Sequence, residues 1–297
     1  MNQNQRAIFA AILCHFFWDV SFLASRTALN NAPVTILLSH RFLLAFLVMS
    51  LLLPLPPADC HLRSKDLRPL LLLGLFEPVI YFFGEQYGIL HSSTSFSGVM
   101  ISIIPIASTL AAMPVLGEKP TMGQLFCSIL SVAGVIGIGL INKNSGTLDW
   151  IGVALLMLAV FSAVFYTLLS RGLSDRYTPF ERSYGMLGVG AVVFTVLAVI
   201  QTRGNLIEYL APLRVPGYRI SVLFLSICCS VICYFLSGYT LTYFSVARAT
   251  VFANLTTAVS VLAGVLVLHE PFSPVGMVCC IMILLGIYGV QTTAGAE

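Results

Sequence analysis

Charged residues are scarce in this chain. Asp, Glu, Lys and Arg together make up only 9% of its 297 residues, whereas an ordinary soluble domain contains about 25%. Hydrophobic residues reach 58%, and a soluble core cannot hide that much apolar surface. The scarcity of charge therefore excludes an ordinary soluble protein and indicates a chain whose solvent is lipid.

Long polar stretches are also missing. A helix needs about 20 mostly apolar residues to cross a hydrocarbon layer of about 30 Å. The uncharged runs here are continuous, which favours helices over barrel strands, whose signature is alternation. We therefore predict an all-α polytopic membrane protein with ten transmembrane helices, at about residues 7–29, 34–55, 68–90, 94–116, 121–142, 149–171, 179–201, 219–242, 247–268 and 273–292.

Catalytic and metal-binding signatures are absent. His269 and Glu270 begin no HExxH motif, and the chain has neither G-x-S-x-G nor a phosphate-binding loop. The eight Cys lie mostly in apolar runs, with no further ligands at metal spacing. We expect no enzyme, no cofactor, no metal and no nucleic-acid partner. The first apolar run lacks a cleavage site, so we interpret it as a retained span.

The chain does contain an internal repeat. Ser108–Gly137 matches Ser260–Gly289 without a gap, at a constant offset of 152. Composition alone would not make a Glu in a polar break and two later glycines recur. The shared positions are Ser108, Leu110, Ala111, Val115, Leu116, Glu118, Cys127, Ile129, Gly134 and Gly137, which recur as Ser260, Leu262, Ala263, Val267, Leu268, Glu270, Cys279, Ile281, Gly286 and Gly289.

We therefore predict two five-helix repeats, over residues 1–145 and 146–297. Because five is odd, the second repeat enters the membrane inverted relative to the first. Nine of the 15 Lys and Arg fall on the side of the N-terminus, five on the other side and one within a span. This bias predicts cytoplasmic termini. Inverted repeats enclose a cavity near the midplane, which rocking exposes alternately to either side.

The pattern resembles the EamA-type units of the drug/metabolite transporter superfamily. The likeness covers nearly the whole chain and rests on Trp18 in the first helix, Pro33 and Arg41 at the second, Glu118 and Glu270 at two helix junctions, and Gly134 and Gly286 after them. It implies a ten-helix secondary carrier that exports small metabolites, often amino acids or drugs, across a bacterial inner membrane. One departure is Asp19, where the family usually has Gly after that Trp.

Four charged residues lie within the predicted spans. A charge at mid-span costs roughly 2.5–3.5 kcal/mol on the lenient scale, so each needs a partner or a water-filled cavity. They are Asp19, Arg41, Glu77 and Glu85, with His15 and His40 as titratable neighbours. Asp19 and Arg41 lie about 15 Å and about 12 Å below the same surface. Two interpretations stay open: they pair with each other, or they serve substrate or coupling, with Arg41 clamping a carboxylate.

Glu77, Tyr81 and Glu85 recur every four residues and so share one face of the third predicted helix. Glu77 directly precedes Pro78, where helical hydrogen bonding is disturbed. We hypothesise that this face borders the transport cavity. Glu77 is then the proton- or cation-coupling carboxylate, since desolvation favours its neutral form. In the alternative, either carboxyl stays protonated and only bonds a neighbouring helix.

Other polar residues have both a functional and a structural interpretation. His15, Trp18, Asp19 and Phe22 share a helix face, and Trp18 either stacks on a substrate or simply packs. Asn254 either contacts the cavity or bonds a neighbouring helix. Glu118 and Glu270 either cap the helix that follows each of them or act in gating.

The sequence therefore favours a secondary-active transporter, with a passive channel or a lipid or sugar-carrier flippase as the alternative. The expected partners are a small-molecule substrate, the lipid bilayer and protons as a coupling ion. The glycines of the fifth and tenth helices permit close helix packing. Monomer and homodimer both stay open.

Overall fold

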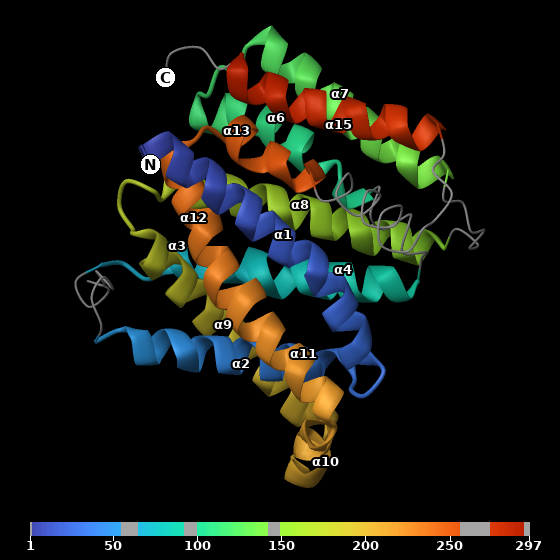
Figure 1. The fold of residues 1–297 in the computed structure, drawn as a ribbon. Helices are drawn as coiled ribbons and strands as arrows, with labels where there is room; N and C mark the ends of the chain where they lie inside the picture. Colours follow the sequence, from blue (N-terminus) through green and yellow to red (C-terminus); the bar gives the residue numbers. More distant parts are fainter. Residues whose placement is uncertain (1, 55–64, 92–99, 142–148, 256–273, 294–297) are drawn as a thin grey trace. The chain divides into compact units, whose positions relative to one another are not determined.

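The computed structural model describes residues 2–54, 65–91, 100–141, 149–255 and 274–293, and all regular structure within these ranges is helical (Figure 1). Five helices in them are long and apolar enough to cross a membrane: Val34–Leu52, Trp150–Gly172, Pro179–Gln201, Pro216–Tyr243 and Pro274–Thr292. Ile104–Leu116 and Met122–Gly137 are shorter apolar helices. The predicted all-helical class is confirmed; the number ten is not tested.

The helices follow one another with short connections. Their bounds are α1 (Gln3–Leu29), α2 (Val34–Leu52), α3 (Arg68–Gly74), η2 (Leu75–Ile80), α4 (Tyr81–Leu90), α6 (Ile104–Leu116), α7 (Met122–Ile141), α8 (Trp150–Gly172), α9 (Pro179–Gln201), α10 (Leu206–Leu210), η3 (Ala211–Arg214), α11 (Pro216–Ser226), η4 (Ile227–Ile232), α12 (Cys233–Tyr243), α13 (Val246–Thr250), η5 (Val251–Asn254) and α15 (Pro274–Thr292).

Proline accounts for several of these bounds. Pro179 and Pro216 are the first residues of α9 and α11, where the missing N–H costs least. Pro105 also lies in the first turn, of α6, and so starts a helix instead of kinking one. Pro78 lies inside a continuous helical run and does break it, as predicted.

Two of the long helices contain a π-helical segment at corresponding positions. η2 covers residues 75–80 and η4 covers 227–232, which is 152 residues later. The helices that follow, α4 and α12, also begin 152 residues apart, and so do α7 and α15. The sequence repeat is therefore matched by helix bounds and by an uncommon local conformation.

The described chain packs as two compact units. The first unit comprises Met1–Ile80 and Leu173–Thr242, and the second comprises Tyr81–Gly172 and Tyr243–Glu297. Each unit takes segments from both halves of the sequence. The chain crosses from one unit to the other at the end of η2, after α8 and at the end of α12.

The core of the first unit is apolar and aromatic. α2 packs along α9, as Figure 1 shows, with Phe42 and Phe194 stacked at 5.5 Å between ring centroids. A second cluster of buried residues joins α1, α2, α9 and α11. Its members are Ala28, Ala32, Ile36, Leu37, Ala198, Tyr218, Val222, Leu225 and Cys229.

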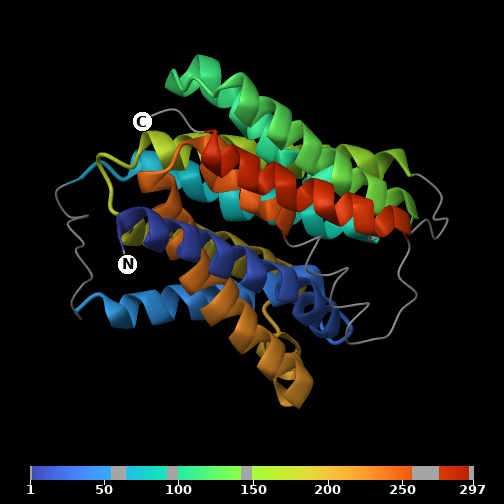
Figure 2. The same ribbon diagram turned by 45° about the horizontal axis from the view of Figure 1, so that its top comes forward.

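In the second unit, α7 and α15 lie side by side (Figures 1 and 2). Their contact is reciprocal across the repeat: a Cβ on Gly134 would lie 2.6 Å from the Cys279 carbonyl oxygen, and one on Gly286 would lie 2.6 Å from the Cys127 carbonyl oxygen. Only glycine fits such an approach. The predicted close packing is confirmed, and these glycines are used within one chain.

Candidate functional site

The site begins at the break in the third predicted helix. Glu77 has φ −136° and ψ 118°, which is extended backbone inside an otherwise helical run. The ring of Pro78 disfavours the helical conformation for the residue before it, which explains the position of the break. The Glu77 side chain is nevertheless buried, with 7% of the residue exposed. A carboxyl group is therefore held in an apolar interior at a helix discontinuity.

Tyr234 is the partner of this carboxyl group. Its hydroxyl group donates to Glu77 Oε1 at 2.9 Å, and only 1% of Tyr234 is exposed. Tyr234 comes from α12, 157 residues away, and we did not predict it. The only signal in the sequence was a phenol within an apolar span, which needs a hydrogen-bond partner when it is buried.

Trp18 lies against Tyr234 on the other side. The two rings meet edge to face with centroids 5.7 Å apart, and His15 meets Trp18 at 5.3 Å. Trp18 Nε1 donates to the Cys229 carbonyl oxygen at 3.0 Å. That oxygen lies in η4, where the Cys233 N–H bonds other carbonyls than this one. The π-helical segment thus leaves an acceptor for the indole.

Arg41 is buried in α2, with 2% exposed, and its Nε donates to Ser230 Oγ at 2.9 Å. Ser230 also lies in η4, and its hydroxyl donates to the Leu225 carbonyl oxygen at 2.9 Å. The Asp19 side chain is outside the part of the chain that the structure describes, as is Phe22. The predicted pair of Asp19 with Arg41 therefore stays a prediction.

The predicted common face of Glu77, Tyr81 and Glu85 is wrong. The break at Glu77 interrupts the helical period, so a spacing of four no longer places residues on one face. Tyr81 and Glu85 lie beyond the break in the second unit, where the Tyr81 hydroxyl donates to Glu85 Oε1 at 2.9 Å. Gln86 Nε2 donates to Glu85 Oε2 at 3.1 Å. The two carboxylates thus have separate tyrosine partners.

Asn254 is buried in the second unit at the end of η5. Its Nδ2 donates to Ser131 Oγ of α7 at 3.1 Å, which is a bond between helices. Its Oδ1 has no hydrogen-bond partner among the described residues. The structural interpretation of Asn254 therefore accounts for its amide nitrogen and leaves its oxygen as a spare acceptor.

Glu118 caps a different helix from the one expected. Its Oε2 accepts from the N–H of Val246, the first residue of α13, at 2.8 Å, and its Oε1 accepts from Arg171 Nε at 3.2 Å. The following helix, α7, is capped instead by Thr121 and Gln124, which bond each other's backbone N–H. Glu118 also lines a cavity of about 220 Å³. Glu270 lies outside the described residues.

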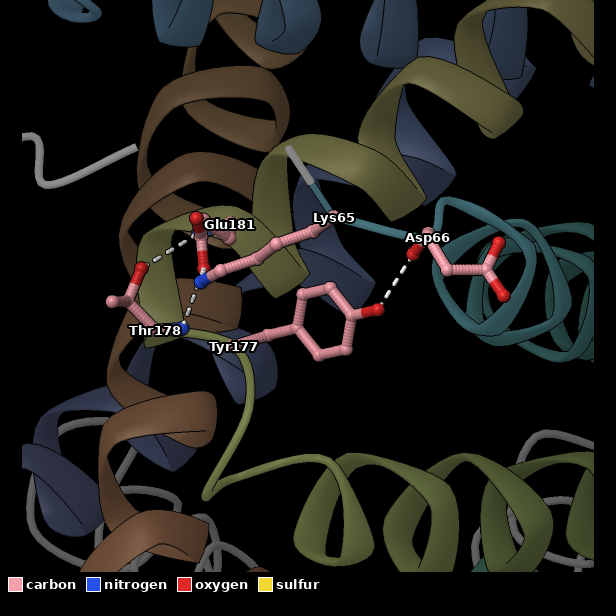
Figure 3. Close-up of polar contacts among 5 residues, drawn as sticks. All are labelled: Lys65, Asp66, Tyr177, Thr178 and Glu181. Atoms are coloured by element: carbon pink, nitrogen blue, oxygen red, sulfur yellow. Dashed lines mark hydrogen bonds and ion pairs between the residues drawn. The ribbon is translucent and has the colours of Figure 1, made fainter. Parts of the chain in front are cut away.

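A polar cluster that we did not predict fixes the start of α9 in the first unit (Figure 3). Glu181 and Thr178 form a reciprocal capping box, with bonds of 2.9 and 3.2 Å. Lys65 Nζ reaches the fully buried Glu181 carboxylate at 2.7 Å, and the Tyr177 hydroxyl donates to the Asp66 carbonyl oxygen at 2.6 Å. The sequence Thr-Pro-Phe-Glu was a readable signal for the capping box.

Arg182 follows in the same turn of α9. We had placed it among the loop cations, but it is buried, and its Nη2 donates to the Gly238 carbonyl oxygen at 2.7 Å and to Thr242 Oγ1 at 2.5 Å. Both acceptors lie near the C-terminal end of α12, where carbonyl groups lack helical partners and favour a cation. Arg182 therefore fixes α12 to α9.

Outside the spans, Asp149 precedes α8 and caps it. A hydrogen bond from the Ile151 N–H at 3.0 Å, and His91 Nδ1 at 2.9 Å from Oδ2, hold the pKa of this carboxyl below its usual range. No group of three or more potential metal ligands occurs among the described residues. The described polar groups support binding and proton exchange more than hydrolysis or redox chemistry.

Comparison with known proteins agrees with this arrangement. The model of the EamA-like transporter family matches the chain twice, at residues 5–140 and 150–292. An uncharacterized transporter, YcxC, of Bacillus subtilis (strain 168) is 31% identical over 97% of this chain and 93% of its own length. A probable terminal-alkyne amino-acid exporter of Streptantibioticus cattleyicolor is 26% identical over 92% and 89%.

One solved crystal structure, 15% identical, superposes with a TM-score of 0.80 over 97% of both chains, which shows the fold alone. The apolar helices and the homologous transporters together make this chain a multi-pass membrane protein with a transport role. Because the family model matches nearly all of it, the chain belongs to the EamA-like transporter family.

Proposed function

We propose that this protein is a secondary-active exporter of small metabolites in the cell inner membrane, with both termini in the cytoplasm. Two inverted five-helix repeats, residues 1–145 and 146–297, expose a central site alternately to either side. The double family match, the offset of 152 between the π-helical segments and the reciprocal glycine contact support two related repeats.

The observation that carries the proposal is the buried carboxyl group of Glu77, bonded by Tyr234 beside Trp18. A carboxyl group in an apolar interior costs several kcal/mol when it is charged, so proton binding and release there are strongly coupled to its surroundings. Glu77 is the proton-coupling residue, and Trp18 with His15 provides an aromatic surface for the substrate. Glu85, Tyr81 and Asn254 are polar contacts of the second unit.

The substrate class is small amino acids or drug-like amphiphiles. A buried guanidinium at Arg41 matches a carboxylate, and an aromatic pair matches an apolar or cationic group. The amino-acid exporter among the relatives agrees with this class. Asp19 and Arg41 are either a structural pair or part of the substrate contact.

The test is counterflow in proteoliposomes, with substrates first selected from a metabolite panel by thermal stabilisation of the purified protein. We expect saturable counterflow in the wild-type protein. Glu77→Gln keeps exchange but loses its acceleration by a pH gradient. Glu208→Gln, a matched change on the exposed side of α10, behaves as the wild-type protein does.

Three results would contradict the proposal. Flux that is linear in substrate concentration indicates a passive channel, and lipid scrambling without counterflow indicates a flippase. A pH response that is the same in Glu77→Gln and in the wild-type protein removes Glu77 as the coupling group.

A further inference from the structure

A continuous set of contacts links two helix irregularities in the first unit. It runs from the Cys229 carbonyl oxygen to the Trp18 indole, from Trp18 to the Tyr234 ring, and from the Tyr234 hydroxyl to Glu77. Glu77 lies in η2 and Cys229 in η4, at positions separated by the repeat offset of 152. Trp18 and Tyr234 are thus held between corresponding π-helical segments.

The strength of one contact in this set depends on charge. A hydrogen bond to an ionised carboxylate is roughly twice as strong as one between neutral groups. When Glu77 takes up a proton, its hold on the Tyr234 hydroxyl therefore weakens. Because the Tyr234 ring packs edge to face on Trp18, a shift of Tyr234 changes the surroundings of the indole.

We propose that Tyr234 is a positioning residue that transmits the protonation state of Glu77 to Trp18. Proton uptake loosens Tyr234 and releases Trp18 from its packed position, and proton loss restores it. This proposal rests on the proposed function, in which Trp18 meets the substrate. It adds the step by which proton binding reaches the substrate surface.

Other ionisable groups lie on the elements around η2 and α1, and the test must separate them from Glu77. His15 matters most, since its ring touches Trp18 directly. Arg41 bonds Ser230, while Glu181 and Arg182 of α9 bond Lys65 and the Gly238 carbonyl group. The remaining groups are Asp19 on α1, Arg68 at the start of α3 and the thiols of Cys14, Cys229 and Cys233.

The chain allows a direct optical test, because it has only two tryptophans, Trp18 and Trp150. Trp150 is 80% exposed at the start of α8, so Trp150→Phe leaves Trp18 as the single emitter with little change to packing. The emission maximum and quenching of Trp18 are then measured against pH in this background, in nanodiscs. A His15→Gln version excludes direct titration of the neighbouring imidazole.

We expect Trp18 emission to shift with pH in the background protein and in the His15→Gln version. The shift is lost in Glu77→Gln and in Tyr234→Phe, which keeps the ring but removes the donor. A shift that persists in Glu77→Gln overturns the proposal, whether or not the Tyr234 variant folds. So does a shift that persists in Tyr234→Phe or is abolished by His15→Gln.

The optical result is independent of transport. If counterflow fails in the wild-type protein while the Trp18 shift depends on Glu77 and Tyr234, the proposed function is wrong and the link stands. If counterflow is normal and the shift is absent in the background protein, the link is wrong and the carrier function stands.

Discussion

Buried polar side chains in this protein are held by specific bonds, several of them to backbone groups. Arg182 bonds the Gly238 carbonyl group, Trp18 bonds the Cys229 carbonyl group, and Glu118 bonds the Val246 N–H. In hydrocarbon there is no water to satisfy such groups, so each bond removes a cost that a soluble protein would avoid at the surface. Helix irregularities supply some of the carbonyl acceptors, as at η4.

The capping box of α9 gives a prediction for a single side chain. Thr178→Ala removes the hydroxyl that accepts from the Glu181 N–H, and an N-cap of this kind contributes about 1 kcal/mol to stability. We expect a lower thermal midpoint in detergent. Thr292→Ala, at an exposed site at the end of α15, is the matched control and leaves the midpoint unchanged. Equal midpoints for both variants would show that the box contributes nothing.

The bond between Arg41 and Ser230 gives a second prediction at this scale. A hydrogen bond to a charged group contributes about 1.5–3 kcal/mol. In a double-mutant cycle with Arg41→Lys and Ser230→Ala, measured by unfolding in mixed micelles, we expect a coupling free energy in this range. Lysine keeps the charge but lacks the Nε donor. A coupling near zero means that Arg41 is held by other contacts.

Single residues also show where sequence reasoning ends. Glu77, Arg41, His15 and Trp18 could be found because a charge or a clustered aromatic is unusual in a span. Tyr234 could not, since the 157 residues between it and Glu77 leave no local pattern. The box at Thr178 was readable as Thr-x-x-Glu, whereas the burial of Arg182 depends on packing against α12.

At the scale of elements, most helix bounds were predictable because apolar length and proline determine them. The residues 202–218 were the exception, since α10 and η3 form there in place of a plain loop. Asn205 caps α10 by accepting from the Ile207 and Glu208 N–H groups. The π-helical segments carry no comparable sequence signal, because they depend on tertiary contacts such as Trp18 on η4.

The contact of α7 with α15 gives a prediction at this scale. Gly134→Ala and Gly286→Ala each place a methyl group 2.6 Å from a carbonyl oxygen of the opposite helix, so the helices must separate. Overpacking of this kind costs about 1–3 kcal/mol. Gly217→Ala in α11 meets no atom within 4 Å and serves as the control.

We expect both interfacial variants to unfold at lower temperature than Gly217→Ala does. Because the two contacts correspond across the repeat, their effects should be similar in size. A strongly unequal pair would contradict the reciprocal role inferred for these glycines.

At the scale of the whole molecule, the compact units do not coincide with the halves of the sequence. η2 ends the first segment of the first unit, and α4 opens the second unit. The break at Glu77 therefore lies just before a crossing of the chain between units. The repeat could be found in the sequence because it preserves residues at a constant offset, whereas the units depend on which helices pack together.

The account depends most on the claim that Glu77 couples transport to protons. The direct measurement is proton movement in proteoliposomes that enclose a pH-sensitive dye, recorded when substrate is added without a pH gradient. We predict a substrate-dependent pH change for the wild-type protein and for Glu208→Gln, and none for Glu77→Gln at equal counterflow. A pH change in Glu77→Gln as large as that of the wild-type protein would contradict the account.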